Sequence, residues 1–242
     1  MSAGGENAMI EAVFFDIDDT LYDRSTPFRR ACEEFFSIPP EDPYAAYLCV
    51  KARGDEVFLP SQRGEITMEE MVIFRVCRGF ADVGIDLTPE EALSFNACYR
   101  SKQGEISLSD TMRGILSFCR TSVPKLGLIT NGTSEKQRRK IASLALSEFV
   151  LPELILVSGE VKLDKPDLRL YELAQSRCGC PAEKILYIGD SIAHDIAPAS
   201  LLGWKTVLLD RNREHKEKTL PSGCTLAQNE EELARVIHHF DF

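Results

Sequence analysis

The chain has 242 residues, of which 44% are hydrophobic and 27% are charged, as is typical of a globular protein with one large domain or a domain and an insertion. It has 28 Lys and Arg residues against 38 Asp and Glu residues, so its net charge is −10. This balance argues against a protein that coats nucleic acid or an anionic membrane, because either partner requires a basic surface.

The sequence contains no recognisable targeting or membrane segment. Residues 1–9 are mostly small and polar and are expected to be flexible, and no apolar run approaches the roughly 20 residues that span a bilayer. The eight cysteines include no C-x-x-C pair, which favours buried free thiols over disulfides or a zinc site. We therefore expect a cytoplasmic protein with no nucleic-acid or membrane partner. The sequence is compatible with a monomer and with a dimer.

The predicted secondary structure changes character twice along the chain. Residues 12–15 have the apolar composition of a strand that is buried on both faces. Residues 25–103 then read as about four helices, with a hydroxyl cap and proline at Ser25-Thr26-Pro27 and capping boxes at Thr67 and Thr88. From about Ser107, helices at 110–120, 134–146, 168–177, 195–201 and 230–240 alternate with strands at 125–130, 154–157, 184–188 and 205–209.

This alternation predicts a parallel sheet with helices on both faces. The first strand precedes the helical stretch and the other strands follow it. We therefore predict an α/β fold with a doubly wound parallel sheet, formed by residues 10–22 and 108–242. Residues 23–107 are predicted to be an inserted all-helical domain.

Polar side chains follow four of the predicted strands. Asp16, Asp18, Asp19 and Thr20 come after the first strand, and Thr130 and Asn131 come after the next. A loop with Lys165 follows the third strand, and Asp190 and Asp195 follow the fourth. Ligands bind at the carboxyl ends of the strands in such sheets, so we expect these groups to lie at one edge.

Several carboxylates at one edge would repel each other by about 4 kcal/mol per close pair at an effective dielectric constant of 20. A divalent cation with oxygen ligands relieves this repulsion, and Mg²⁺ is the abundant choice. A lysine beside such an acidic, metal-loaded site favours an anionic ligand with several oxygens. The sequence therefore predicts a site for Mg²⁺ and a phosphoryl group.

The four clusters resemble the four motifs of the haloacid dehalogenase-like (HAD) hydrolases, in the family's order and over residues 10–210. The matching residues are Asp16-Ile17-Asp18-Asp19-Thr20, Thr130-Asn131, Lys165-Pro166-Asp167 and Gly189-Asp190 with Asp195. The helical insertion is similar to the cap that one branch of the family carries between its first two motifs. The resemblance implies a Rossmann-like core, Mg²⁺ as cofactor and hydrolysis of a small phosphorylated metabolite.

The resemblance also implies a role for each residue. Asp16 is then the nucleophile that becomes an aspartyl-phosphate, and Asp18 is the general acid and base. Thr130 and the backbone N–H of Asn131 hold phosphoryl oxygens, and Lys165 offsets charge on the nucleophile and on the phosphoryl group. Metal ligands are the carboxylates of Asp16 and Asp190 and the backbone carbonyl of Asp18, while Thr20 and Asp195 have supporting roles.

Asp18 decides the chemistry within this resemblance. Dehalogenating members resemble D-x-Y-G-T at the first motif, without the second aspartate, because a halide leaving group needs no proton. Asp18 therefore favours phosphate ester hydrolysis. Near the third motif, Lys162 and Leu168 replace a commonly seen glycine and proline. A phosphosugar mutase of the same family and a non-catalytic binding or regulatory protein remain the alternatives.

The choice of substrate is expected to depend on the inserted helical domain. The family resemblance extends to both nucleotide and sugar phosphatases. The candidate specificity residues in this domain are Arg24, Phe28, Arg53, Phe58 and Arg63. Polar linkers at residues 23–26 and 103–109 are expected to let this domain close during catalysis.

Overall fold

The computed structural model describes residues 9–211 and 220–242, which form two compact units. Apart from Met9, the N-terminal segment predicted to be flexible lies outside the described residues. One unit is α/β and comprises residues up to Asp23 together with Ser107–Phe242, and the other runs from Arg24 to Ile106. Among the described residues, no helix is long and apolar enough to cross a membrane.

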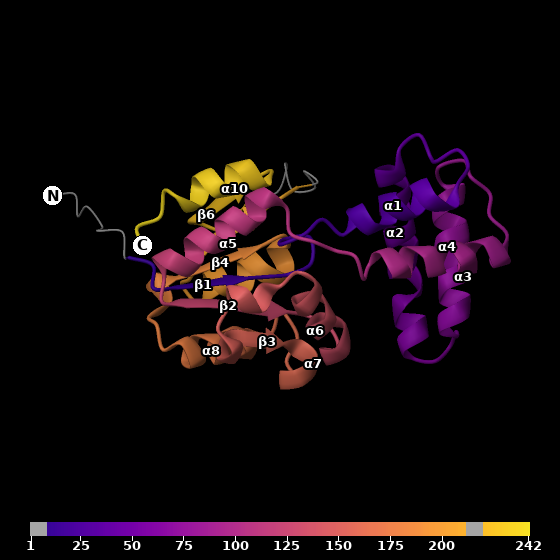
Figure 1. The fold of residues 1–242 in the computed structure, drawn as a ribbon. Coiled ribbons are helices and arrows are strands. Elements are labelled where there is room, and N and C mark those ends of the chain that lie inside the picture. Colours follow the sequence, from indigo (N-terminus) through magenta and orange to yellow (C-terminus); the bar gives the residue numbers. More distant parts are fainter. Residues whose placement is uncertain (1–8, 212–219) are drawn as a thin grey trace. The chain divides into compact units, whose positions relative to one another are not determined.

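The α/β unit is built on one six-stranded sheet (Figure 1). The strands pair in the order β3-β2-β1-β4-β5-β6, and every pair is parallel. Register places Ala12 of β1 between Lys125 of β2 and Ile185 of β4. The strands are β1 (Ala12–Phe15), β2 (Lys125–Thr130), β3 (Ile155–Val157), β4 (Ile185–Gly189), β5 (Lys205–Leu209) and β6 (Cys224–Ala227).

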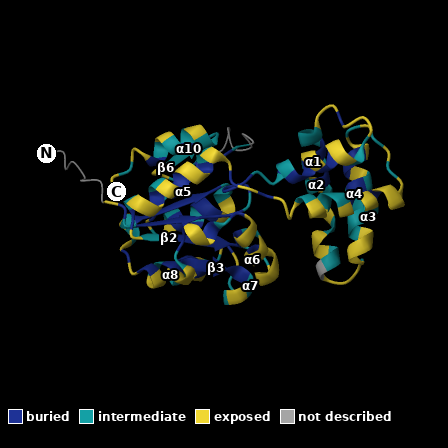
Figure 2. Cartoon of the chain, viewed as in Figure 1, coloured by how far each residue is buried: buried dark blue, intermediate teal, exposed yellow. Residues whose placement is uncertain are grey.

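Helices cover both faces of this sheet, with α5 and α10 on one side and α8 on the other (Figure 1). Strands β1 to β5 are almost completely buried, and exposed residues gather on the outer faces of the helices (Figure 2). The helices are α5 (Asp110–Ser122), α6 (Ser134–Ser143), α7 (Ser158–Val161), α8 (Leu168–Cys178), α9 (Ala197–Leu201) and α10 (Glu230–Ile237). Short turns are η1 (Leu146–Glu148), η2 (Pro152–Leu154), η3 (Ala182–Lys184) and the π-helical η4 (Ile192–Ile196).

The predicted doubly wound sheet is therefore confirmed, with differences at its margins. The sequence prediction missed β6, whose residues are mostly half-buried, as expected at a sheet edge. The helix predicted to end near residue 146 stops at Ser143, because the chain turns at Ala145 with a φ of 53°. The eight cysteines are all free, but four of them are only half-buried.

The helical unit consists of α1 (Ser25–Phe35), α2 (Pro43–Gln62), α3 (Met68–Ala81) and α4 (Pro89–Lys102). Both predicted capping boxes are present, because Thr67 and Thr88 exchange hydrogen bonds with the glutamates three residues later. The hydroxyl cap predicted at the start of α1 is wrong: Ser25 lies inside the helix, and Arg24 at the cap position makes no side-chain capping bond.

An aromatic core holds the helical unit together. Phe28 of α1 lies at its centre, with ring centroids 5.1 Å from Phe95 and 5.7 Å from Phe80. The backbones of α2 and α3 approach closely at Gly79, where a β-carbon would lie 2.5 Å from Val50. Burial of such rings stabilises the unit by its own contacts, without residues from the sheet.

Candidate active site

The strand order brings three of the predicted site segments together. Because β1 lies between β2 and β4, the residues after these strands share one edge of the sheet. Thr130 ends β2, Asp16 follows β1, and Asp190 follows β4. Carboxylate oxygens of Asp16, Asp190 and Asp195 lie within 4.8 Å of one another and form the acidic cluster of the site.

Lys165 is the cation at the centre of this cluster. Its ammonium group donates to Asp16 Oδ1 and to Asp195 Oδ1, each at 2.6 Å, and all three residues are at most 6% exposed. Burial lowers the pKa of Lys165, but the charges of Asp16 and Asp195 outweigh that effect and raise it above its ordinary value. Lys165 therefore remains positively charged beside the predicted nucleophile.

The side chain of Asn131 fixes the backbone of Lys165 from both sides. Asn131 Oδ1 accepts a hydrogen bond from Lys165 N at 2.8 Å, and Asn131 Nδ2 donates to Lys165 O at 3.0 Å. The amide group thus ties the loop after β3 to the end of β2. The side chain of Asn131 is therefore engaged by Lys165. Its backbone N–H is the group predicted to contact the phosphoryl oxygens.

The carboxylate of Asp195 accepts hydrogen bonds from three donors of the protein. Oδ1 accepts from Lys165 and from Tyr187 at 3.0 Å, and Oδ2 accepts from the backbone N–H of Ser191 at 3.0 Å. Gly189 makes this position possible, because a β-carbon there would lie 2.5 Å from Asp195 Cβ. Its occupied oxygens fit a residue that orients Lys165 better than a direct metal ligand.

The cluster carries more negative than positive charge. Burial raises the pKa of Asp16 to about 7, with Lys165 opposing the rise and Asp195 and Asp18 adding to it. Burial also raises the pKa of Asp190, to about 8, and the nearby charges of Asp16, Asp195 and Asp19 add to that rise. The carboxylates of Asp16 and Asp190 supply hard oxygen donors, and the three carboxylates outnumber the single ammonium of Lys165, so the residues fit a divalent cation.

The carboxylate of Asp18 points to a different set of partners, centred on α6. Lys140 Nζ contacts both of its oxygens at 2.6 Å, Tyr22 donates to Oδ1 at 2.6 Å, and Gln137 donates to Oδ2 at 3.0 Å. Sequence reasoning missed all three partners. The only available signal was a pair of polar residues three positions apart on the helix after β2, and this pattern is common on exposed helix faces.

Arg211 connects the loop after β1 to the first residue of α10. Its guanidinium donates to the backbone oxygens of Asp19 at 3.1 Å and Thr20 at 2.7 Å, and it pairs with Glu230 at 2.6 Å. Glu230 in turn accepts from Ser109 at the start of α5. The completely buried Thr20 thus lies in a loop whose backbone is held from two directions.

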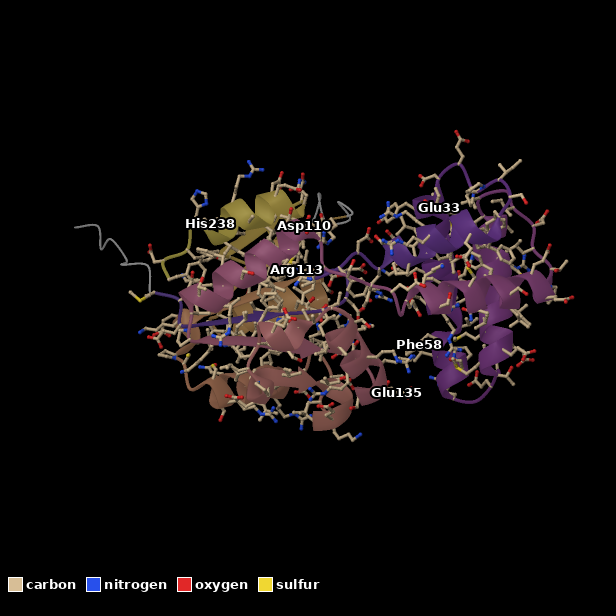
Figure 3. All side chains as sticks on the ribbon, viewed as in Figure 1. Glu33, Phe58, Asp110, Arg113, Glu135 and His238 are labelled. Carbon is tan, nitrogen blue, oxygen red and sulfur yellow. The ribbon has the colours of Figure 1, made fainter. Side chains whose placement is uncertain are left out.

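The predicted specificity residues of the helical unit differ in their availability. The prediction that Phe28 contacts the substrate is wrong, because Phe28 is completely buried in the core of the helical unit. Arg53 is engaged by Asp82 and Glu56, and Arg63 lies 3.7 Å from Glu65. Phe58, labelled in Figure 3, is 54% exposed. Arg24 is half-buried.

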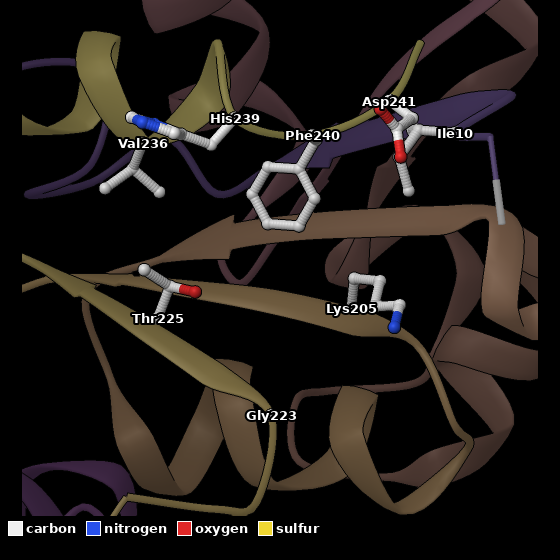
Figure 4. Close-up of a pocket in the computed structure, with 8 residues that line it drawn as sticks. All are labelled: Ile10, Lys205, Gly223, Thr225, Val236, His239, Phe240 and Asp241. Atoms are coloured by element: carbon white, nitrogen blue, oxygen red, sulfur yellow. The ribbon is translucent and has the colours of Figure 1, made fainter. Parts of the chain in front are cut away.

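A cavity of about 300 Å³ lies at the other end of the sheet (Figure 4). Lys205 is the first residue of β5, Gly223 directly precedes β6, and Ile10 lies two residues before β1. The cavity therefore adjoins the amino ends of these strands. It is therefore separate from the acidic cluster. It is lined by Ile10, Lys205, Gly223, Thr225, Val236, His239, Phe240 and Asp241.

Comparison with protein-family models matches residues 10–203 to the haloacid dehalogenase-like hydrolases. The chain belongs to this family. The match spans both units and all of the predicted site residues, from Asp16 to Asp195. It confirms the family that the four motifs indicated, and it makes the protein a HAD-like hydrolase.

Curated relatives of this HAD-like protein include phosphatases and dehalogenases. A glyceraldehyde 3-phosphate phosphatase from Methanothermobacter thermautotrophicus is 27% identical over 225 residues, which are 87% of this chain and 92% of the relative. An (S)-2-haloacid dehalogenase from Pseudomonas putida is also 27% identical, over 84% of this chain and 85% of the relative. Overall similarity therefore does not decide between these reactions.

Solved structures share the fold of the whole chain. The HAD-hydrolase YfnB from Bacillus subtilis, described as bound to magnesium and as revealing interdomain movement, matches with a TM-score of 0.67. The match covers 95% of this chain and 99% of that one at 22% identity. It supports the same fold for both proteins.

Proposed function

We propose that this protein is a Mg²⁺-dependent phosphatase that hydrolyses a small phosphorylated metabolite through an aspartyl-phosphate intermediate. The observation that carries the proposal is the buried contact of Lys165 with Asp16, beside Asp190 and two residues from Asp18. A carboxylate nucleophile next to a fixed cation and a metal-binding carboxylate suits attack on a phosphate ester.

The carboxylates of Asp16 and Asp190, with the backbone carbonyl of Asp18, would hold the Mg²⁺. When bound, the metal would neutralise charge on the nucleophile and on the phosphoryl oxygens. This role fits the raised pKa values of Asp16 and Asp190, which result first from burial and then from the neighbouring carboxylates. Lys165 would balance part of the remaining charge through its contact with Asp16.

In the first step, an oxygen of Asp16 forms a bond to phosphorus while the ester P–O bond breaks. The departing oxygen keeps the electron pair of that bond and takes a proton from Asp18. In the second step, Asp18 removes a proton from water, whose oxygen attacks phosphorus and displaces Asp16. Thr130 and the backbone N–H of Asn131 would hold phosphoryl oxygens in both steps.

Asp18 favours this reaction over dehalogenation. The relatives include both a phosphatase and a dehalogenase at the same identity, so the choice depends on residues of the site. A halide departs without a proton, whereas an alkoxide leaving from a phosphate ester requires one. Asp18, which is held by three polar side chains, can supply this proton to the leaving alkoxide, whereas a leaving halide needs none.

The helical unit is proposed to act as the cap that selects the substrate. The phosphatase relative acts on glyceraldehyde 3-phosphate, which supports a small organic phosphate as the substrate class. Exposed and half-buried residues of this unit, such as Phe58 and Arg24, are better placed to contact a substrate than the buried Phe28.

The test of this proposal is the variant Asp16→Asn. The amide has nearly the size of the carboxylate but cannot act as the nucleophile. We expect hydrolysis of p-nitrophenyl phosphate with Mg²⁺ to fall by a factor of at least ~10³, with an unchanged circular dichroism spectrum. Turnover close to that of the parent protein would refute the role of Asp16. No turnover of any phosphorylated metabolite by the parent protein would favour a binding protein.

A further inference from the structure

The side chain of Asp18 lies in a cradle formed by Tyr22, Gln137 and Lys140. Lys140 contacts both carboxylate oxygens at 2.6 Å, Tyr22 contacts one oxygen, and Gln137 contacts the other. Asp18 and Lys140 have side chains that are only 18% and 25% exposed. Each of these contacts brings a donor to the carboxylate, so Asp18 is held as an acceptor of hydrogen bonds.

Gln137 connects this cradle to the predicted phosphoryl site. It is 1% exposed, and its Nε2 lies 3.0 Å from Asp18 Oδ2, 2.8 Å from Thr130 Oγ1 and 2.5 Å from the backbone oxygen of Asn131. The carboxylate of Asp18 and the backbone carbonyl of Asn131 accept hydrogen bonds, so the NH₂ end of the Gln137 amide faces them. Gln137 thus places one amide nitrogen beside both the carboxylate of Asp18 and the hydroxyl of Thr130.

We infer that Lys140, with Gln137 and Tyr22, is a positioning residue that holds Asp18 for the attack of water on the aspartyl-phosphate. This inference rests on the proposed function. In that step an O–H bond of water breaks and the proton passes to Asp18, while the oxygen bonds to phosphorus and the Asp16 O–P bond breaks. Asp18 must be an acceptor at that moment, and the cradle presents it as one.

The preceding step places a different demand on Asp18. Transfer of the phosphoryl group to Asp16 needs a proton from Asp18 only when the leaving group is a poor one. The p-nitrophenolate anion leaves without a proton. With p-nitrophenyl phosphate, damage to the cradle should therefore slow the second step and leave the first step nearly intact.

The variant Lys140→Met tests this inference in the complete protein with Mg²⁺. We expect kcat for p-nitrophenyl phosphate to fall about tenfold or more and KM to fall by a similar factor, because the phosphoenzyme accumulates. The ratio kcat/KM, which reports only the steps up to phosphoryl transfer, should change less than about twofold. A rapid burst of about one p-nitrophenolate per active site should precede the slow steady state.

The matched control is Lys136→Met, which removes the same charge from the exposed side of α6, one turn before Lys140. Its kcat and KM should equal those of the parent protein. Lys140→Arg should restore most of kcat, because a guanidinium can also contact both oxygens of a carboxylate. Lys140→Gln gives the same test if the methionine variant has a lowered melting temperature.

Two results would overturn the inference. One is an equal fall in kcat and kcat/KM without a burst, which is the signature of a general structural defect. The other is a Lys140→Met variant that behaves like Lys136→Met. Both results are distinct from a failure of the proposed function, which would appear as Mg²⁺-dependent hydrolysis that survives Asp16→Asn.

Discussion

Two aspartates of the candidate site have side-chain environments suited to different work. Asp16 lies against the ammonium of Lys165 and the carboxylates of the acidic cluster, whereas Asp18 is surrounded by the donors of the cradle. The acidic cluster gains from an added cation, and Asp18 already has one in Lys140. Carboxylates two positions apart in the sequence thus face different side chains, which suits Asp16 to the proposed role of nucleophile and Asp18 to that of proton carrier.

Metal binding should depend on pH through Asp16 and Asp190. Their pKa values of about 7 and 8 lie above the unfolded value of 3.8, so without metal their contribution to stability is present below about pH 4 and is lost as the pH rises to 8. Mg²⁺ replaces the bound protons. We expect Mg²⁺ to raise the melting temperature by several degrees more at about pH 8.5 than at about pH 5.5.

Calorimetric titration in buffers of different ionisation enthalpy gives a direct check of the same prediction. Binding of Mg²⁺ at about pH 6.5 should release roughly one proton or more per site. An equal rise in melting temperature at both pH values, with no proton release, would contradict the assignment of Asp16 and Asp190 as ligands.

Asp18→Asn and Asp190→Asn should fail in different ways. The amide at position 190 is a weaker ligand, so part of the lost activity should return at tens of millimolar Mg²⁺. The amide at position 18 cannot carry the proton, and added metal cannot replace that function. Initial rates with a slowly leaving alkyl phosphate, measured over a magnesium titration, compare the two variants. Equal recovery in both would refute the separate roles.

The end of β4 shows how a strand positions a functional side chain. Asp195 lies against Gly189 so closely that any β-carbon there would overlap it, and Asp195 in turn orients Lys165. Gly189→Ala should therefore lower the free energy of unfolding by about 1–3 kcal/mol and reduce kcat.

Gly114→Ala on α5 is the matched control, because an added β-carbon there meets nothing within 4 Å. This change should leave kcat intact and should stabilise the helix by about 0.5–1 kcal/mol. Denaturant unfolding monitored by circular dichroism measures both free energies. A Gly189→Ala variant as stable and active as the parent protein would show that Asp195 can move without consequence.

The sequence predicted the elements of this fold where a pattern was repeated locally. The apolar runs of β1, β2 and β5 and the capping boxes at Thr67 and Thr88 each have a local physical cause. The edge strand β6 was missed because its half-buried residues Cys224–Ala227 lack a continuous apolar run. The start of α1 was misassigned because Ser25 and Pro27 fit more than one position of a first turn.

The site was predictable to the extent that it lies at strand ends. Asp16, Thr130 and Asp190 follow or end apolar runs, and a parallel sheet necessarily brings such positions to one edge. Lys140 and Gln137 were not predictable, because the face that α6 turns toward Asp18 depends on how the loop after β2 enters the helix. Tertiary packing determines that rotation, and no residue type encodes it alone.

At the scale of the molecule, a chain of contacts joins the second linker to the candidate site. Ser109 donates to Glu230, Glu230 pairs with Arg211, and Arg211 holds the backbone of Asp19 and Thr20. A change at the linker can therefore reach the loop that carries the predicted nucleophile.

We expect a phosphoryl mimic to change the mobility of both linkers. Beryllium fluoride with Mg²⁺ should slow hydrogen exchange at residues 23–26 and 103–109 by about tenfold, if phosphoryl binding favours closure of the cap. Exchange in β1 should not change, because that strand is buried in both states. Unchanged exchange at the linkers, in spite of saturating mimic, would support a cap that does not move.

The placement of β1 at the centre of the sheet has a consequence for the order in which the protein is made. The ribosome completes β1 early, but its neighbours β2 and β4 begin only at Lys125 and Ile185. The helical unit, by contrast, is one continuous segment with its own aromatic core. It can fold during synthesis while β1 is still without partners. The nascent chain would thus acquire the part proposed to select the substrate before the part proposed to react with it.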